Sequence, residues 1–310
     1  MTTALISHVD CMGHRTPPGH PERTQRLESI SRKLSERTFS SLLRLDAPVC
    51  SNRDILHAHS RAHLGFIEIS EPRSGWRSLD ADTHMSAGSF IAAKRAVGAI
   101  CRAVDLVVSG EIANAFCAVR PPGHHAEVER AMGFCLFSNV AIGALHAKKQ
   151  HGLERVAILD FDVHHGNGTS NILWDEESVL FASTHEMPLY PGTGFASERG
   201  RHNQIINMPL QPRSGSRPYR EAIEIILERM DAFRPQLVIV SAGFDAHYRD
   251  PLATLRLSEE DFSWTTERVC DIADLHCSGR VLSSLEGGYD LVGLTDSVAA
   301  HVKVLMDRGA

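Results

Sequence analysis

The chain contains 310 residues, of which 43% are hydrophobic and 23% charged, and its formal net charge is −6 at pH 7. These proportions are typical of a globular protein with a large core, and they exclude general disorder. Because nucleic acids and anionic membranes attract basic surfaces, we expect neither to be a partner of this acidic chain.

The N-terminus and the cysteines indicate where the protein resides. The first residues, MTTALISHVD, lack the basic start and the apolar core of a signal peptide, and no apolar run approaches the length of a membrane span. The seven cysteines are odd in number and include no Cys-x-x-Cys pair, which argues against a disulfide framework and a zinc finger. We therefore expect a location in the reducing cytoplasm.

Short apolar runs alternate with helical patterns along the chain. Helices are predicted at residues 88–107, 138–150, 218–233, 259–275 and 291–307, the first starting near Ser86 or Ser89 and the fourth capped by Ser258. Strands are predicted at residues 115–120, 155–162, 179–184, 236–245 and 280–288, several of them almost continuously apolar. This alternation predicts an α/β fold with a mainly parallel central sheet flanked by helices, and no linker divides residues 1–310 into more than one domain.

Polar, glycine-rich segments follow the predicted strands. In chain order they are PPGHHA, DVHHGNG, STHE, GFDAH and EGGYD. The carboxyl ends of parallel strands meet at one edge of a sheet, and ligands of open α/β sheets bind at that edge. We therefore expect the functional site there.

The segment DFDVHH suggests a metal site. Alternate Cα atoms of an extended chain lie roughly 6.5 Å apart, so Asp162 and His164 can reach one ion. Asp245, at the end of the apolar strand predicted at 236–245, can complete a set of two carboxylates and one imidazole, the open layout of a catalytic zinc site. For an Asp-x-His pair alone, ordinary hydrogen bonds at a strand end are the commoner explanation, and Asp245 by itself can equally cap a loop.

Two further patterns suggest acid–base chemistry. The tandem histidines His124 and His125 can act as general base and electrostatic helper, provided that neighbours such as Asp160 and Asn167 fix their tautomers. Tyr289 follows two glycines at another strand end, where its phenol can donate a hydrogen bond to a developing oxyanion. A histidine pair alone is commonly a surface feature, and a tyrosine at this place alone commonly just covers the strand end.

Taken together and in order, the motifs are highly specific and cover almost the whole chain: GHPERTQRL (19–27), DTHMSAGSFIAAKRAVGA (82–99), RPPGHHA (120–126), GFCLFSNVAIGA (133–144), LDFDVHHGNGT (159–169), YPGTG (190–194), SAGFDAHYRDPLATL (241–255) and EGGYD (286–290). The chain thereby resembles the zinc-dependent histone deacetylase and acetylpolyamine amidohydrolase family, whose α/β fold is arginase-like. The resemblance implies a single deacetylase-like catalytic domain over residues 1–310.

The resemblance also implies a role for each matching position. The implied zinc ligands are Asp162, His164 and Asp245, and the implied catalytic residues are the base His125, its electrostatic partner His124, and Tyr289. Asp160 and Asn167 would hydrogen-bond His124 and His125, respectively. The implied substrate channel comprises Gly133, Phe134, Tyr190, Gly287 and Gly288. The implied structural potassium site comprises Asp160, Asp162, His164, Ser183 and Thr184.

Two positions refine the implied function. Asn167 stands where one large branch of the family has aspartate, which resembles the class II enzymes and their bacterial relatives and makes His125 a weaker base. Tyr289 stands where some poorly active class II members have histidine, so we expect a working amidohydrolase. Its substrate would be N-acetyl-lysine or another acylated amine, hydrolysed by water that the metal activates.

Several alternatives stay open. The substrate can be a protein or a small amide such as an acetylpolyamine, the metal can be iron(II) or cobalt instead of zinc, and a homo-oligomer is not excluded. A metal-binding protein of the same fold without turnover is less favoured, because a pure binder has no need of an oxyanion donor beside a base. A dimanganese ureohydrolase ranks lower still, since DVHHGNG lacks the additional bridging carboxylates.

Overall fold

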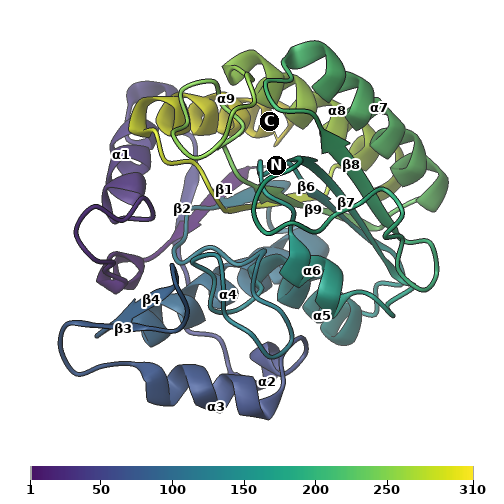
Figure 1. Ribbon diagram of the computed structural model, residues 1–310. Helices are drawn as coiled ribbons and strands as arrows, with labels where there is room; N and C mark the ends of the chain where they lie inside the picture. Colours follow the sequence, from purple (N-terminus) through teal and green to yellow (C-terminus); the bar gives the residue numbers. More distant parts are fainter. Residues whose placement is uncertain (1, 310) are drawn as a thin grey trace.

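The computed structural model describes residues 2–309. Within them, eight strands form a parallel sheet in the order β2-β1-β5-β10-β9-β6-β7-β8 (Figure 1). In chain order the strands are β1 Thr3–Ser7, β2 Leu43–Asp46, β5 Asn114–Cys117, β6 Val156–Asp160, β7 Val179–Glu186, β8 Ile205–Leu210, β9 Leu237–Ala242 and β10 Val281–Leu285. The predicted parallel α/β sheet is confirmed.

The five predicted strands are all present, and they are β5, β6, β7, β9 and β10. Every residue of these five strands is buried, which explains why several of them, such as β6 and β9, are almost continuously apolar. The sequence analysis missed β1, β2 and β8 in the sheet. It also missed the small antiparallel pair formed by β3 Trp76–Ser78 and β4 His84–Ser86. Strand β2 is short and mostly exposed, and β8 contains a proline and an asparagine, so neither shows the apolar pattern of a central strand.

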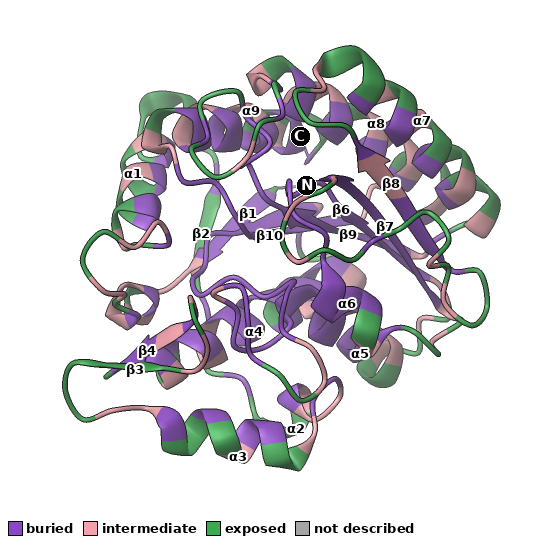
Figure 2. Cartoon of the chain, viewed as in Figure 1, coloured by how far each residue is buried: buried purple, intermediate pink, exposed green. Residues whose placement is uncertain are grey.

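Helices cover both faces of the sheet (Figure 1). One layer contains α4 Ser89–Ser109 and α5 Asn139–His151, and the opposite layer contains α1 Gln25–Leu34, α7 Ser216–Phe233, α8 Glu259–Cys277 and α9 Leu291–Gly309. Shorter helices are α2 Asn52–Ile55, α3 Arg61–Ser70 and α6 Asn167–Ile172, with 3₁₀ turns η1 Val9–Gly13 and η2 Arg37–Phe39. The central strands are buried, whereas the edge strand β2 and the outward faces of the helices are largely exposed (Figure 2).

The predicted starts of two helices can be compared with the starts in the structure. Ser258 is the N-cap of α8 as predicted, and its backbone N–H donates to the Asp261 carboxylate at 3.1 Å. Helix α4 begins at Ser89, and its N-cap is Gly88, whose φ of 94° lies in the left-handed region that favours glycine.

Among residues 2–309, no helix combines the length and apolar character needed to cross a bilayer.

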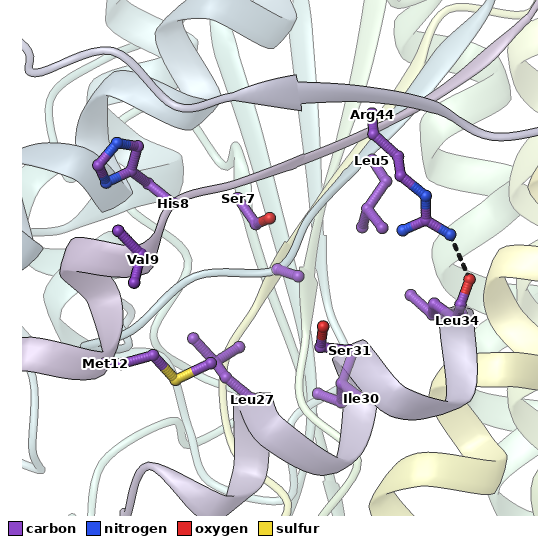
Figure 3. Close-up of a pocket in the computed structure, with 11 residues that line it drawn as sticks. Leu5, Ser7, His8, Val9, Met12, Leu27, Ile30, Ser31, Leu34 and Arg44 are labelled. Carbon is purple, nitrogen blue, oxygen red and sulfur yellow. Dashed lines mark hydrogen bonds between the residues drawn. The ribbon is translucent and has the colours of Figure 1, made fainter.

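The sheet order determines where the polar segments meet. Strands β5, β10, β9, β6 and β7 are consecutive neighbours and parallel, so the five segments that follow them lie side by side at one edge. A separate cavity of about 300 Å³ lies beside the end of β1, between η1 and α1 (Figure 3). It is lined largely by apolar side chains, and Arg44 from β2 lies at one side of it, where it donates to the Leu34 carbonyl oxygen.

Candidate active site

Two aspartates and one histidine beyond the ends of β6 and β9 converge in the interior. His164 Nδ1 lies 3.0 Å from Asp162 Oδ1 and 3.2 Å from Asp245 Oδ2. All three residues are buried, and one donor atom of each lies within 4.8 Å of the other two. The Oδ2 atom of Asp245 is buried without a hydrogen-bond partner among residues 2–309. Two carboxylates and an imidazole with one unsatisfied oxygen form a donor set that fits zinc or a similar divalent ion.

Backbone N–H groups from neighbouring loops hold both carboxylates. Asp162 accepts hydrogen bonds from the backbone N–H of His164 at 2.9 Å and from that of Gly287 at 2.8 Å. Asp245 accepts one from Val163 at 2.9 Å. A Cβ atom at position 287 would lie 2.0 Å from Asp245 Oδ2, so only glycine lets the loop after β10 approach this closely.

Hydrogen bonds also orient the tandem histidines. Nδ1 of His124 lies 3.0 Å from Asp160 Oδ2. Nδ1 of His125 lies 2.7 Å from the amide oxygen of Asn167, whose amide nitrogen donates to Glu127 Oε1 at 2.7 Å. Because an amide oxygen can only accept, His125 carries its proton on Nδ1 and keeps a lone pair on Nε2. The structure thus brings each histidine to the partner expected for it.

The two histidines lie in opposite electrostatic environments. Burial disfavours charge on His124, but the carboxylates of Asp162 and Asp160 outweigh it and hold the His124 pKa well above its usual range. At His125, burial and the neighbouring His124 charge both lower the pKa well below its usual range. Burial raises the pKa of Asp160 to about 6, although His124 acts in the opposite direction. At neutral pH the pair therefore combines one neutral and one charged imidazole.

A cavity of about 210 Å³ gives access to these groups. It is lined by Asp82, His125, Gly133, Phe134, His164, Leu189, Tyr190, Leu252 and Tyr289. The expected channel residues Gly133, Phe134 and Tyr190 lie on its wall, and Tyr190, which is 37% exposed, marks the outer end. Gly287 and Gly288 are not part of this wall, and Gly287 instead lies against the metal-donor carboxylates.

Tyr289 lies on the cavity wall with its ring buried. Its backbone N–H donates to Asp250 Oδ2 at 2.7 Å, and the Arg26 guanidinium lies 5.1 Å from the ring centroid. The Phe134 ring meets it edge-on at a centroid distance of 5.9 Å. Burial, reinforced by the charge of Asp245, raises the pKa of the phenol well above its usual range. The hydroxyl therefore keeps its proton and can act as a donor.

The residues expected to hold potassium lie around the ends of β6 and β7. Asp160 and Ser183 are direct partners in the register of these strands. The Ser183 hydroxyl lies 3.0 Å from His185 Nδ1, whereas the buried Thr184 hydroxyl has no hydrogen-bond partner in the part of the chain described. One buried hydroxyl among the expected potassium residues is thus without a hydrogen-bond partner.

The Histone deacetylase domain model matches residues 20–305. The chain belongs to the histone deacetylase family. It is 39% identical over 300 residues to a probable deacetylase of Archaeoglobus fulgidus, covering 94% of this chain and 83% of that protein. It is also 39% identical over 277 residues to a histone deacetylase-like amidohydrolase of Pseudomonas aeruginosa, covering 87% of this chain and 71% of the relative. The crystal structure of the HDA15 HD domain superposes with a TM-score of 0.94 at 34% identity, covering 99% of this chain and 89% of that one.

A buried charge cluster, which the sequence did not single out, supports the active-site loops of this histone deacetylase family member. Arg120 donates two hydrogen bonds to the Glu22 carboxylate, and Arg26 donates one to it at 3.1 Å. Arg26 Nε also donates to the carbonyl oxygen of Gly288 at 2.7 Å. The three charged side chains are fully buried. Their only signal in the sequence is their place within GHPERTQRL and at the start of RPPGHHA.

Two more acidic residues went unassigned in the sequence. The buried Glu286 carboxylate accepts the backbone N–H of Gly123 at 2.6 Å and that of His124 at 3.1 Å, so it ties the histidine loop to the end of β10. Burial raises the pKa of Glu286 to about 7. Asp82 lies on the cavity wall itself. Both residues lie inside motifs that the resemblance used, but nothing in their local pattern separates them from exposed acids.

Proposed function

We propose that the protein is a zinc-dependent amidohydrolase that hydrolyses N-acetyl-lysine or a related N-acylated amine to the free amine and acetate. The observation that carries this proposal is the convergence of a neutral histidine, a metal-donor histidine and a buried phenol on one cavity of about 210 Å³. Relatives described as deacetylases and as an amidohydrolase support hydrolysis of an acyl amide.

Asp162, His164 and Asp245 would hold the zinc ion, and the unsatisfied Asp245 oxygen supports this assignment. A bound zinc ion supplies a Lewis acid that polarises a carbonyl and lowers the pKa of water. Iron(II) and cobalt accept the same donors. The second proposed cation is a structural potassium ion at Asp160, Asp162, His164, Ser183 and Thr184.

The protein's own side chains would move the proton and stabilise the developing charge. His125 Nε2 accepts the proton of the attacking water, because Asn167 holds the imidazole proton on Nδ1. The Tyr289 hydroxyl donates to the carbonyl oxygen as it gains negative charge. His125 then returns the proton to the amine nitrogen as the C–N bond breaks. The charged His124 stabilises negative charge nearby without changing protonation.

The cavity wall suits a slender acylated alkyl amine. The Phe134 and Tyr190 rings and two leucine side chains line it, so apolar methylene groups can be buried along its length. The acyl carbonyl would then lie at the inner end beside His125 and Tyr289. A second candidate substrate class, acetylated polyamines, is favoured by Asp82, because a carboxylate on the wall attracts an additional ammonium group.

The direct test is turnover by the zinc-loaded protein of an acetyl-lysine peptide and an acetylated polyamine, side by side. We expect hydrolysis of at least one substrate and loss of that activity in Tyr289→Phe. Asp82→Asn distinguishes the two classes, since it should raise KM more for the polyamine than for a neutral peptide. Failure of the zinc-loaded protein to hydrolyse either substrate would contradict the proposal and favour a binding protein of the same fold.

The proposal includes the domain organisation of the protein and its location in the cell. Residues 1–310 would form one catalytic domain, and this is supported by a hydrophobic core that runs from β1 to α9. The seven cysteines are buried and unpaired in the part of the chain described, as expected for the reducing cytoplasm.

A further inference from the structure

Three side chains that the proposed reaction does not use meet where α4 packs on α5. Asp105 belongs to α4, whereas His146 and His151 belong to the last turns of α5. One oxygen of Asp105, Oδ1, lies 2.8 Å from His146 Nε2 and 2.7 Å from His151 Nε2. The two rings meet edge-on with centroids 5.9 Å apart. A single carboxylate oxygen therefore lies against two imidazole nitrogens from a neighbouring helix.

We propose that Asp105, His146 and His151 form a second metal site, which takes a divalent first-row transition ion such as Zn²⁺. One donor atom of each residue lies within 4.8 Å of the other two, as in the candidate active site. Two imidazole nitrogens and one carboxylate oxygen are the donors that these ions prefer, with a fourth position for water. The partial exposure of Asp105 and His151 gives the ion a path from solvent.

The buried atoms of His146 supply an independent reason to expect a ligand. The residue is only 7% exposed, and its Nδ1 atom is buried without a hydrogen-bond partner among residues 2–309. If Nε2 donates a proton to Asp105, a neutral His146 leaves a lone pair on Nδ1, and that lone pair faces the Asp54 carboxylate at 3.6 Å. A metal ion on Nε2 moves the proton to Nδ1, where it points toward Asp54. This is the carboxylate–histidine–metal arrangement that commonly orients ligating histidines.

A competing donor set uses the other nitrogen of His146. Asp54, Cys101 and His146 also have donor atoms within 4.8 Å of one another. Geometry favours the set that contains His151, because Asp105 Oδ1 already lies 2.8 Å from His146 Nε2 and 2.7 Å from His151 Nε2, whereas His146 Nδ1 lies 3.6 Å from Asp54 Oδ1. Asp105 and His151 are also partly exposed, whereas Cys101 is buried. A His146 that only hydrogen-bonds its neighbouring carboxylates, with no metal bound, is the remaining alternative.

This site would be separate from the proposed catalytic centre. The strands carry the catalytic residues at their carboxyl ends, whereas the last turns of α4 and α5 lead into the amino ends of β5 and β6. The cluster thus lies toward the opposite edge of the sheet. A metal ion there would join α4 to α5 and stabilise their packing without contacting the substrate cavity.

The test is the number of Zn²⁺ ions bound per chain, measured by competition with a chromophoric chelator. We expect His151→Gln and Asp105→Asn each to bind one ion fewer than the unaltered protein. The matched control is His276→Gln, because His276 also lies near a helix end with Nε2 2.7 Å from a single carboxylate, that of Asp231. Among residues 2–309, His276 belongs to no group of three possible metal donors. The control should bind the same number of ions as the unaltered protein.

Two further measurements complete the test. Zn²⁺ added beyond the first equivalent should raise Tm of the unaltered protein and of His276→Gln, but not that of His151→Gln. The turnover of His151→Gln should equal that of the unaltered protein. Equal zinc counts in His151→Gln and the unaltered protein would overturn the proposal. Loss of the second ion in Cys101→Ser but not in His151→Gln would assign it to the competing donor set, and this too would overturn it.

Discussion

Tyr289→Phe is the substitution that separates catalysis from folding most clearly. The contacts that hold Tyr289 are its backbone N–H bond to Asp250, the Arg26 guanidinium over its ring and the edge of the Phe134 ring, and phenylalanine keeps all three. Loss of the hydroxyl should therefore change the free energy of unfolding by less than about 1 kcal/mol. Loss of one oxyanion donor typically lowers kcat about 10²–10³-fold, equivalent to roughly 2.7–4 kcal/mol. Because Tyr289 is buried, we expect the upper part of that range.

The assay compares kcat and KM of the two zinc-loaded proteins on the acetyl-amine substrate that the unaltered protein hydrolyses. The loss should fall on kcat rather than on KM, because the hydroxyl acts on charge that develops only in the transition state. Zinc content and Tm serve as controls, since the substitution leaves the metal donors untouched. A kcat within threefold of the unaltered protein would refute the assignment of Tyr289 as the oxyanion donor.

Three other substitutions test separate parts of the structure. In Asn167→Asp, a carboxylate near His125 Nδ1 favours the protonated imidazole and raises the His125 pKa. Because the base must be neutral to act, the acidic limb of the kcat/KM profile should move to higher pH by about 1 pH unit. An unchanged profile would argue against His125 as the base. Glu22→Gln leaves the buried Arg120 without its carboxylate partner, so it should lower the free energy of unfolding by about 3–5 kcal/mol, as measured by urea titration. A loss below about 1 kcal/mol would contradict the importance of this buried ion pair. Gly287→Ala places a methyl group against the metal-donor carboxylates and should weaken zinc binding at least about tenfold in chelator competition, so unchanged affinity would count against the assigned donors.

The strands that position the site were predictable because each is buried on both faces. Residues 156–160 and 237–242 are apolar almost throughout, and such runs are distinctive without any neighbour. Strand β2 was not predictable, since it is short and its side chains are largely exposed. The expectation that polar residues would gather at one edge succeeded because parallel strands present their carboxyl ends together.

The sequence by itself determined the kinds of chemical groups and their places after particular strands. Asp162 and His164 were expected to share a face of an extended chain, but β6 ends at Asp160 and residues 162–164 form a bend, so the two-residue period does not by itself explain why they meet. Only the tertiary structure decided which distant groups meet. Strand order brings Gly287 against Asp162, and it brings Arg26 against Gly288. The periodicity of the sequence does not predict these contacts between distant residues.

The tertiary structure likewise decided the charge of identical side chains. His124 and His125 are adjacent in the chain, yet one lies between carboxylates and the other beside an amide and a charged imidazole. The same holds for His146 and His151, whose common partner Asp105 comes from another helix. The pKa of a side chain and its capacity to bind a metal depend on burial and on the groups that surround it in space. A pattern of neighbours along the chain specifies neither.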